Sequence, residues 1–477
     1  MFPLSFKPMD YSLEEYFYQK TLTISSILNK KVLCITELKK CAWGGIPKCL
    51  RPLCWRIMIE GIGENKVSRM EEFKNRKEKY YNGLKYNLRG DYHLNEDERI
   101  KYNLNGCGDI KFLCILEDRI NNEIMKCRME NKDLMDIINN FYNIVKEEIE
   151  KDCNFNVFKE EIKIGFLNSN KEIKEKEKNN VKVKPIEKKY VENNVKIEPI
   201  EKMDIDMKNR LIYRIKKFIN IIYKNLIRLD EIFNGEEIQE EDYKLFFLDK
   251  KIFHQIFIDI RRIGKEFRVK NNKNLDFIYL EILTAVAQNK PLVGYVQGMA
   301  DLLVPFIDVF YGQEEIIYCG ISSTFYCYSK IIEKIQDNYI GQQQGIYHLV
   351  YKLEKLIKVL DPSLYCHLEN EGVKTHMFSF RWFNCIFARE FILDDQLMIL
   401  DTLLSNKDFK DFLLHFAFSL LSNFKEKINE GDFSDIIILL QNIKERKWKH
   451  SELLVLFSKA YINQEIFYGT KIELYYK

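Results

Sequence analysis

The sequence predicts an all-α fold, and three observations lead to that prediction. Apolar residues recur at spacings of three and four in one segment after another, which is the period of a helix that buries one face. Only nine prolines and twenty glycines occur among the 477 residues, so few positions interrupt a helix. Hydrophobic residues make up 46% of the chain, which is long enough to bury a sizeable core. We therefore expect a folded, mainly helical protein with room for more than one domain-sized unit.

The overall composition argues against several classes of function. The 74 basic and 71 acidic residues nearly cancel, so binding of nucleic acid through bulk charge is not expected. The twelve cysteines include no C-x-x-C pair, which favours reduced thiols in the cytosol over zinc ligands or a redox motif. The polar start is unlike a signal peptide, and no apolar run approaches the roughly 18 residues of a membrane span. The sequence thus predicts a soluble, cytoplasmic protein.

The first 85 residues contain an extension and the start of a domain. A helix is expected in the extension from Ser12 onward. The turn Trp43–Pro47 follows, and a second helix then begins with Pro52 near its first position. Because Trp55 lies three residues after Pro52, both fall on one helix face, and Trp55 is expected to anchor the core there.

Residues 86–207 are predicted to be an insertion. Its part at 108–150 has apolar residues on one face and predicts amphipathic helix. From 168 to 206 the composition shifts to Lys, Glu, Asn, Val and Ile, which cannot bury enough apolar surface, so this part is predicted to be disordered. A 14-residue period is seen there only twice, too few units for a solenoid. A docking tail is the alternative, but a solvated low-complexity loop fits the composition better.

Helical order is expected to resume at Leu211. Apolar residues recur at spacings of three and four as far as Leu229, and the other face carries lysine and arginine. A basic amphipathic helix of this kind can lie on a membrane. The apolar side is aliphatic and wide, however, so we favour a core helix with a solvated basic face.

One central stretch carries the candidate chemistry. It opens with I-x-x-D-x-x-R, which contains Asp259 and Arg262, and later contains Y-x-Q-G, with Tyr295 and Gln297. Between the two patterns, 275–288 has the apolar density of a buried helix. On periodicity alone, Asp259 and Arg262 fall opposite the buried stripe and form an exposed ion pair, and Gln297 is an ordinary loop amide.

The remaining chain continues as helix and offers no competing site. Asp361 and Pro362 predict a turn between two helices, whereas Arg381 and Trp382 fall in an apolar helix and are assigned to packing. No G-x-x-x-x-G-K-[ST] or G-x-S-x-G motif occurs, and the seven histidines are dispersed. Nucleotide binding through a P-loop, serine-hydrolase chemistry and a metal cluster are therefore not predicted.

Taken together, these patterns resemble the TBC domain, the Rab-type GTPase-activating fold. The start G-I-P-x-x-x-R-P-x-x-W, the pair of central motifs and the later F-S-F-R-W-F-N-C occur in the family's order, over about 40–81 and 250–406. The run from Phe73 to Tyr81 is similar to the Golgi-associated branch. The resemblance implies a two-lobed helical domain interrupted by the insertion. The expected units are an extension (1–35), the start of the TBC domain (36–85), the insertion (86–207), its remainder (208–450) and a helical tail (451–477).

The resemblance also implies a site. Arg262 corresponds to an arginine finger and Gln297 to a glutamine finger, both inserted into a partner Rab-type small GTPase. Asp259 and Tyr295 correspond to supporting residues that orient the two loops. GTP and Mg²⁺ belong to the partner, so no cofactor or metal is expected in this chain. Peripheral association with internal membranes through that partner, at the Golgi by analogy to the branch, is the implied location.

Three positions depart from the family's pattern. Arg261 stands where a small residue or proline is common, and Ile263 stands where a threonine is common. Two arginines then compete for the finger position, and the finger loop turns less sharply. Leu400 replaces a tryptophan before Asp401, a change expected to affect packing only. The alternative function is therefore a helical scaffold that binds a GTPase or coat component without stimulating hydrolysis.

Overall fold

A computed structural model describes residues 13–84, 232, 250–263, 274–311 and 317–470. The regular secondary structure of the described backbone is helical, with no strand apart from one isolated antiparallel bridge between Val32 and Asn65. The predicted all-α fold is therefore confirmed. The helices expected at 108–150 and from Leu211, and the low-complexity segment 168–206, lie outside the described residues.

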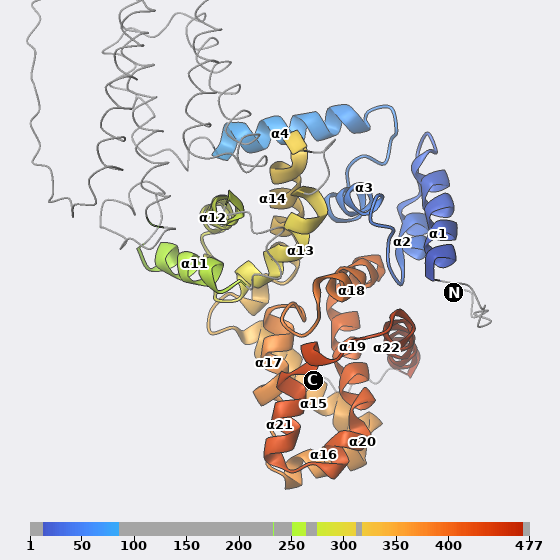
Figure 1. Cartoon of the computed structure of the whole chain (residues 1–477), viewed down its shortest axis with the longest axis vertical. Helices are drawn as coiled ribbons and strands as arrows, with labels where there is room; N and C mark the ends of the chain where they lie inside the picture. The colour runs from blue at the N-terminus through green and yellow to red at the C-terminus, as the bar shows by residue number, and fades with distance from the viewer. Residues whose placement is uncertain (1–12, 85–231, 233–249, 264–273, 312–316, 471–477) are drawn as a thin grey trace, which may run out of the picture. The chain divides into compact units, whose positions relative to one another are not determined.

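The chain divides into two compact units, residues 1–88 with 246–477 and residues 89–245. The first unit contains nearly all the described residues and has two lobes, which Figure 1 shows in blue to yellow and in orange to red. The helices of the N-terminal lobe are α1 (Leu13–Leu28), α2 (Ile35–Ala42), α3 (Arg51–Trp55), the π-helix η1 (Arg56–Glu60), α4 (Arg69–Leu84), α11 (Lys250–Arg262), α12 (Asn274–Asn289), α13 (Met299–Tyr311) and α14 (Ile317–Lys334).

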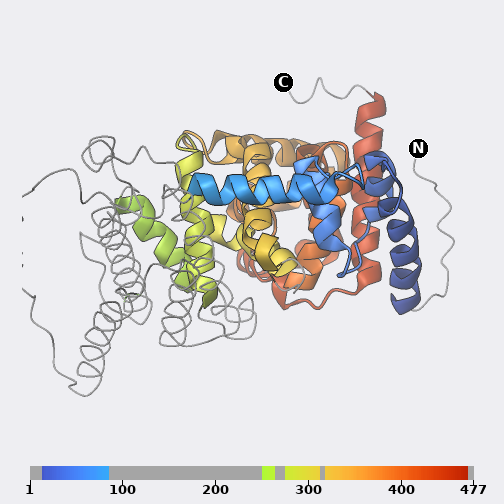
Figure 2. The ribbon, with the colours of Figure 1, turned by 90° about the horizontal axis from the view of Figure 1, so that it is seen from above.

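The α12 helix is the core element of the N-terminal lobe. It packs against α11, α13 and α14, and α4 lies across α14 (Figure 2). Most of its described side chains are buried, including Ile282, Leu283 and Val286. This burial confirms the helix predicted at 275–288. The Y-x-Q-G motif follows α12, whereas the I-x-x-D-x-x-R motif lies in α11, which packs against α12.

The C-terminal lobe is a bundle whose central helix is α19. Its helices are α15 (Gln344–Leu360), α16 (Pro362–Asn370), α17 (His376–Asn384), α18 (Leu393–Ser405), α19 (Phe409–Asn423), α20 (Lys425–Glu430), α21 (Phe433–Gln441) and α22 (His450–Thr470). Nearly every residue of α19 is buried, and the helix packs along α22 and α15. The predicted turn is present, because the Asp361 side chain accepts the backbone N–H of Leu364 and begins α16.

A buried carboxylate in α18 joins the start of the chain to this lobe. Asp401 is fully buried and accepts hydrogen bonds from the indole of Trp55 at 2.7 Å and the backbone N–H of Ile46 at 2.7 Å. The guanidinium of Arg51 lies 3.1 Å away and balances its charge. The Trp55 core anchor expected from the sequence is confirmed. Its polar partner lies 346 residues further along the chain.

Candidate functional site

Arg262 is the last residue of α11 and is exposed. Phe253, Ile256 and Ile260 bury one face of this helix, as the periodicity predicts. The side chain of Arg262 keeps 58% of its surface exposed, and its Nη1 lies 3.7 Å from Oδ1 of Asp259. A guanidinium in this position is tethered weakly and can reach a partner molecule.

Gln297 is exposed in the loop that connects α12 to α13. Gly294 and Gly298 flank it with φ values of 59° and 99°, a region of backbone space that favours glycine. The loop therefore turns sharply on both sides of the Y-x-Q segment and presents Gln297 at the surface. Within the described residues, no hydrogen bond restrains the side-chain amide of Gln297.

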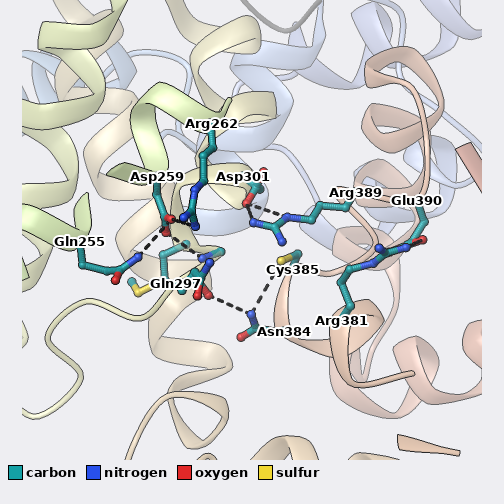
Figure 3. A network of polar contacts seen from close by, with 12 residues as sticks. Gln255, Asp259, Arg262, Gln297, Asp301, Arg381, Asn384, Cys385, Arg389 and Glu390 are labelled. Carbon is teal, nitrogen blue, oxygen red and sulfur yellow. Dashed lines mark hydrogen bonds and ion pairs between the residues drawn. The ribbon is translucent and has the colours of Figure 1, made fainter. Parts of the chain in front are cut away.

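Asp259 connects the Arg262 helix to the Gln297 loop (Figure 3). It is 3% exposed, so the exposed ion pair expected from periodicity alone is wrong. Its Oδ2 accepts the hydroxyl of Tyr295 at 2.9 Å and the backbone N–H of Gly298 at 3.1 Å. Its Oδ1 accepts the side-chain amide of Gln255 at 3.2 Å. One buried carboxylate thus contacts both the Arg262 side chain and the Gln297 loop.

Tyr295 is a donor to this carboxylate and stays protonated. Burial, and then the negative charge of Asp259, raise the pKa of the Tyr295 hydroxyl well above its ordinary value. The phenol therefore keeps its proton at neutral pH and continues to donate to Asp259. Asp259 and Tyr295 therefore lie together, and the supporting role that the resemblance implies for them stays a prediction.

The two residues that depart from the family's first motif are both engaged elsewhere. The guanidinium carbon of Arg261 lies 4.6 Å from the centroid of the Phe257 ring, a cation–π contact on the same helix. Ile263 is 4% exposed and extends the buried stripe of α11. Arg262 is thus the arginine of this pair that lies next to Asp259.

The C-terminal lobe reaches the same loop through the end of α17. The side-chain amide of Asn384 donates to the backbone carbonyl of Gln297 at 3.0 Å. Arg389 forms two hydrogen bonds to Asp301 in α13, at 2.6 and 3.0 Å. Figure 3 shows both contacts where the C-terminal lobe meets the Gln297 loop and Asp301. Asn384 and Arg389 were not predicted, because no sequence spacing connects them to residues 87 and 88 positions away.

The assignment of Arg381 to packing needs correction, whereas that of Trp382 is confirmed. Trp382 is fully buried. Arg381 instead pairs with the buried carboxylate of Glu390 through two hydrogen bonds of 2.6 and 2.7 Å. It also donates to the backbone carbonyl of Gln441 at 2.9 Å. This pairing holds the segment after α17 in place.

Comparison with known proteins assigns the family. Residues 222–429 match the sequence model of the Rab-GTPase-TBC domain, RabGAP-TBC. The chain contains a Rab-GTPase-TBC domain. The solved Ypt/Rab-GAP domain of Gyp1p superimposes with a TM-score of 0.57 and 20% sequence identity, covering 96% of this chain and 100% of that one. The TBC domain therefore has the helical fold of that structure.

Curated relatives of the TBC domain include two that are more than 30% identical. The GTPase-activating protein gyp1 of Schizosaccharomyces pombe is 31% identical over 245 residues, 48% of each chain. The human TBC1 domain family member 22A is 34% identical over 227 residues, 44% of each chain. The matched region thus spans about half the length of these relatives.

Proposed function

We propose that this TBC domain is a GTPase-activating protein for a Rab-type small GTPase, with Arg262 and Gln297 supplied in trans to the partner's nucleotide. The observation that carries the proposal is the shared carboxylate. Asp259 is 3.7 Å from the Arg262 guanidinium and accepts the backbone N–H directly after Gln297. Two exposed side chains, one at the end of α11 and one in the loop after α12, are thereby presented from one buried anchor.

Arg262 supplies a positive charge that unassisted GTP hydrolysis, which is slow, lacks. Negative charge develops on the phosphoryl oxygens in the transition state. A guanidinium is always charged, planar and forked, so it can contact two of these oxygens together. An arginine finger of this kind gives ~10³–10⁵-fold acceleration, which is about 4–7 kcal/mol of barrier.

Gln297 meets the second requirement of hydrolysis, because it can orient the attacking water molecule. Its amide can donate to one atom and accept from another, so it can hold a water in line with the phosphorus. The side chain has no competing partner among the described residues. It is thus available to do so once a GTPase is bound.

From the resemblance to the family, we propose that the partner brings the nucleotide and Mg²⁺. Among the described residues, no cluster of histidine, cysteine and carboxylate side chains could hold a metal ion. In the same part of the chain, no helix has both the length and the apolar character needed to cross a bilayer. We propose that the domain meets internal membranes through its partner, at the Golgi by analogy to the branch that the sequence resembles.

A hydrolysis screen against a panel of GTP-loaded Rab proteins tests this function. We expect at least one Rab to be stimulated by ~10³-fold or more, as a finger in trans provides. The competing function, a scaffold that binds without catalysis, predicts binding but no stimulation.

Binding measurements separate the two functions independently of turnover. A GTPase-activating domain contacts charge that develops in the transition state, so it binds the partner carrying GDP and aluminium fluoride more tightly than the partner carrying a ground-state GTP analogue. Equal affinity for the two complexes favours the scaffold and contradicts the proposed function.

A further inference from the structure

The peptide unit between Gln297 and Gly298 is held from both lobes. Its carbonyl accepts the Asn384 side-chain amide from the C-terminal lobe at 3.0 Å. Its N–H donates to the Asp259 carboxylate from the N-terminal lobe at 3.1 Å. In a trans peptide the C=O and N–H lie in one plane and point in opposite directions, so a hydrogen bond at each group fixes the orientation of that plane. The glutamine side chain emerges directly beside it.

Gly298 makes the approach of Asn384 possible. A Cβ at this position would lie 2.8 Å from Nδ2 of Asn384 and 2.8 Å from Sγ of Cys385. Atoms at such a distance must shift, so a side chain here would displace the end of α17. The loop and the end of α17 are therefore in direct contact because residue 298 has no side chain.

Asn384 is itself held in position by its surroundings. The hydroxyl of Tyr339 donates to its backbone carbonyl at 2.8 Å. Directly after it, Ile386 and Phe387 have φ values of 47° and 60°, a left-handed conformation that is unfavourable for these residue types. The Arg389–Asp301 pair then returns the segment to α13. The side chain that reaches Gln297 thus starts from a constrained backbone.

The amide of Asn384 is not explained by fold stability. Only its NH₂ group can donate to a carbonyl, so the bond to Gln297 fixes which way the amide points. That orientation leaves its Oδ1 buried and, within the described residues, without a hydrogen-bond partner. A buried acceptor without a partner destabilises the folded state. The NH₂ group of Asn384 therefore gains a hydrogen bond to the glutamine loop, whereas its Oδ1 is left without one among the described residues.

We propose that Asn384 is a positioning residue for Gln297: its side-chain amide fixes the peptide plane from which the glutamine finger projects. In this role Asn384 acts on catalysis only through the Gln297 loop. The catalytic consequence rests on the proposed function, whereas the effect on the loop does not. Through this bond the C-terminal lobe takes part in orienting a residue that belongs to the N-terminal motif.

Hydrogen exchange on the full chain tests the effect on the loop without a GTPase. Asn384→Ala removes the donor, and Asn384→Asp keeps the size but replaces the donor with an acceptor. Both are expected to speed backbone exchange over residues 293–299 by about tenfold, since the Gly298 N–H is then released more often. Asn370→Ala is the control, because Asn370 is also the last residue of a helix, α16, but is exposed. Unchanged exchange at 293–299 in both Asn384 variants overturns the proposal.

Hydrolysis kinetics test the catalytic consequence. Asn384→Ala is expected to lower maximal stimulation by about 10- to 100-fold, as a small misplacement of a reacting group does, with little change in the concentration that gives half the effect. In a Gln297→Ala background the same change is expected to have no further effect. An equal loss in both backgrounds indicates a general structural role and contradicts the proposal. If the unaltered chain stimulates no Rab, the proposed function fails, and the exchange experiment still decides whether Asn384 holds the loop.

Discussion

Single side chains set the geometry of the candidate site, and Asp259 is central among them. A buried carboxylate is costly unless its oxygens are hydrogen-bonded. Here Tyr295, Gly298 and Gln255 all donate to it. Arg262 adds a nearby positive charge but keeps its own side chain largely in solvent. The carboxylate therefore holds the Gln297 loop against α11, and the arginine remains free to engage another molecule.

Replacing the two neighbouring arginines separately tests which one is the finger. Arg262→Lys keeps the charge but loses the planar fork, so stimulation of hydrolysis should fall by about two orders of magnitude or more. Arg261→Lys should cost far less, because Arg261 lies against the Phe257 ring. Single-turnover hydrolysis with a responsive Rab measures both.

Stability provides the control for these two variants. Arg262 is mostly exposed and lysine keeps its positive charge near Asp259, so Arg262→Lys should unfold almost like the unaltered chain. If Arg262→Lys keeps full stimulation and Arg261→Lys loses it, then the finger is Arg261 and the assignment to Arg262 is wrong. In that case the departure at Arg261 matters more than its contact with Phe257 indicates.

At the scale of elements, the sequence predicts the helices better than it predicts what lies between them. Core helices such as α12 and α19 carry apolar residues at helical spacing, and the Asp361–Pro362 turn is a local signal. Asp259 was expected at the surface because it lies opposite the buried stripe of its own helix. The Gln297 loop covers that side, and its contacts come from residues 36 and 39 positions away. Local periodicity contains no information about such a partner.

The contacts of Asn384 and Asp401 illustrate the same limit over longer distances. Asn384 meets Gln297 across 87 positions, and Asp401 meets Trp55 across 346. Nothing in the spacing of either residue indicates these partners, because they come together only when the lobes pack. The roles of Arg262 and Gln297 remain predictions, since they depend on a partner that is a separate molecule.

The turn between α12 and α13 yields a prediction about Gly298. Gly298→Ala places a Cβ 2.8 Å from Asn384 Nδ2 and Cys385 Sγ, at a φ of 99°. The conformation alone costs on the order of 1–3 kcal/mol. Displacement of the loop should also abolish most of the stimulation. Chemical unfolding and hydrolysis assays measure the two effects.

Gly372→Ala is the matched control for this change. Gly372 also has a positive φ, 73°, but nothing lies within 4 Å of the position its Cβ would take. It should show the conformational cost without loss of stimulation. Equal behaviour of the two variants would mean that the contact with Asn384 and Cys385 does not matter for the loop.

At the scale of the described molecule, buried and half-buried polar groups join elements at lobe and helix junctions. Asp401 joins α18 to the chain start, and the Arg389–Asp301 pair joins the end of α17 to α13. Each of these charges has an opposite charge beside it, which offsets the cost of removing it from water. His415, inside α19, is different because its ring is not hydrogen-bonded among the described residues: the nearest carboxylate, that of Asp411, lies 3.8 Å from its Nε2. The histidine is 1% exposed, and in the described part of the chain neither ring nitrogen has a hydrogen-bond partner.

His415 should therefore make the stability of the protein depend on pH. Burial lowers the pKa of its imidazole from 6.5 to about 4 in the folded state. Between these values the unfolded chain binds a proton that the folded chain does not, so stability falls as pH decreases from 6.5 towards 4. At pH 5.5 the loss from this one residue is about 1.4 kcal/mol, one pKa unit. Urea unfolding of the chain and of His415→Phe, at pH 7.5 and pH 5.5, measures it.

The difference in unfolding free energy between the unaltered chain and His415→Phe separates the effect of His415 from that of other titrating groups. Asp395 is one such group, because burial raises the pKa of its carboxyl to about 6 and it contributes in the opposite direction. Since Asp395 is present in both proteins, its contribution cancels when their free energies of unfolding are subtracted. Phenylalanine fits the aromatic surroundings, in which the Phe467 ring lies 5.5 Å from the imidazole. We expect His415→Phe to gain on the unaltered chain as the pH falls, whereas parallel pH profiles would show that His415 is not buried in its neutral form.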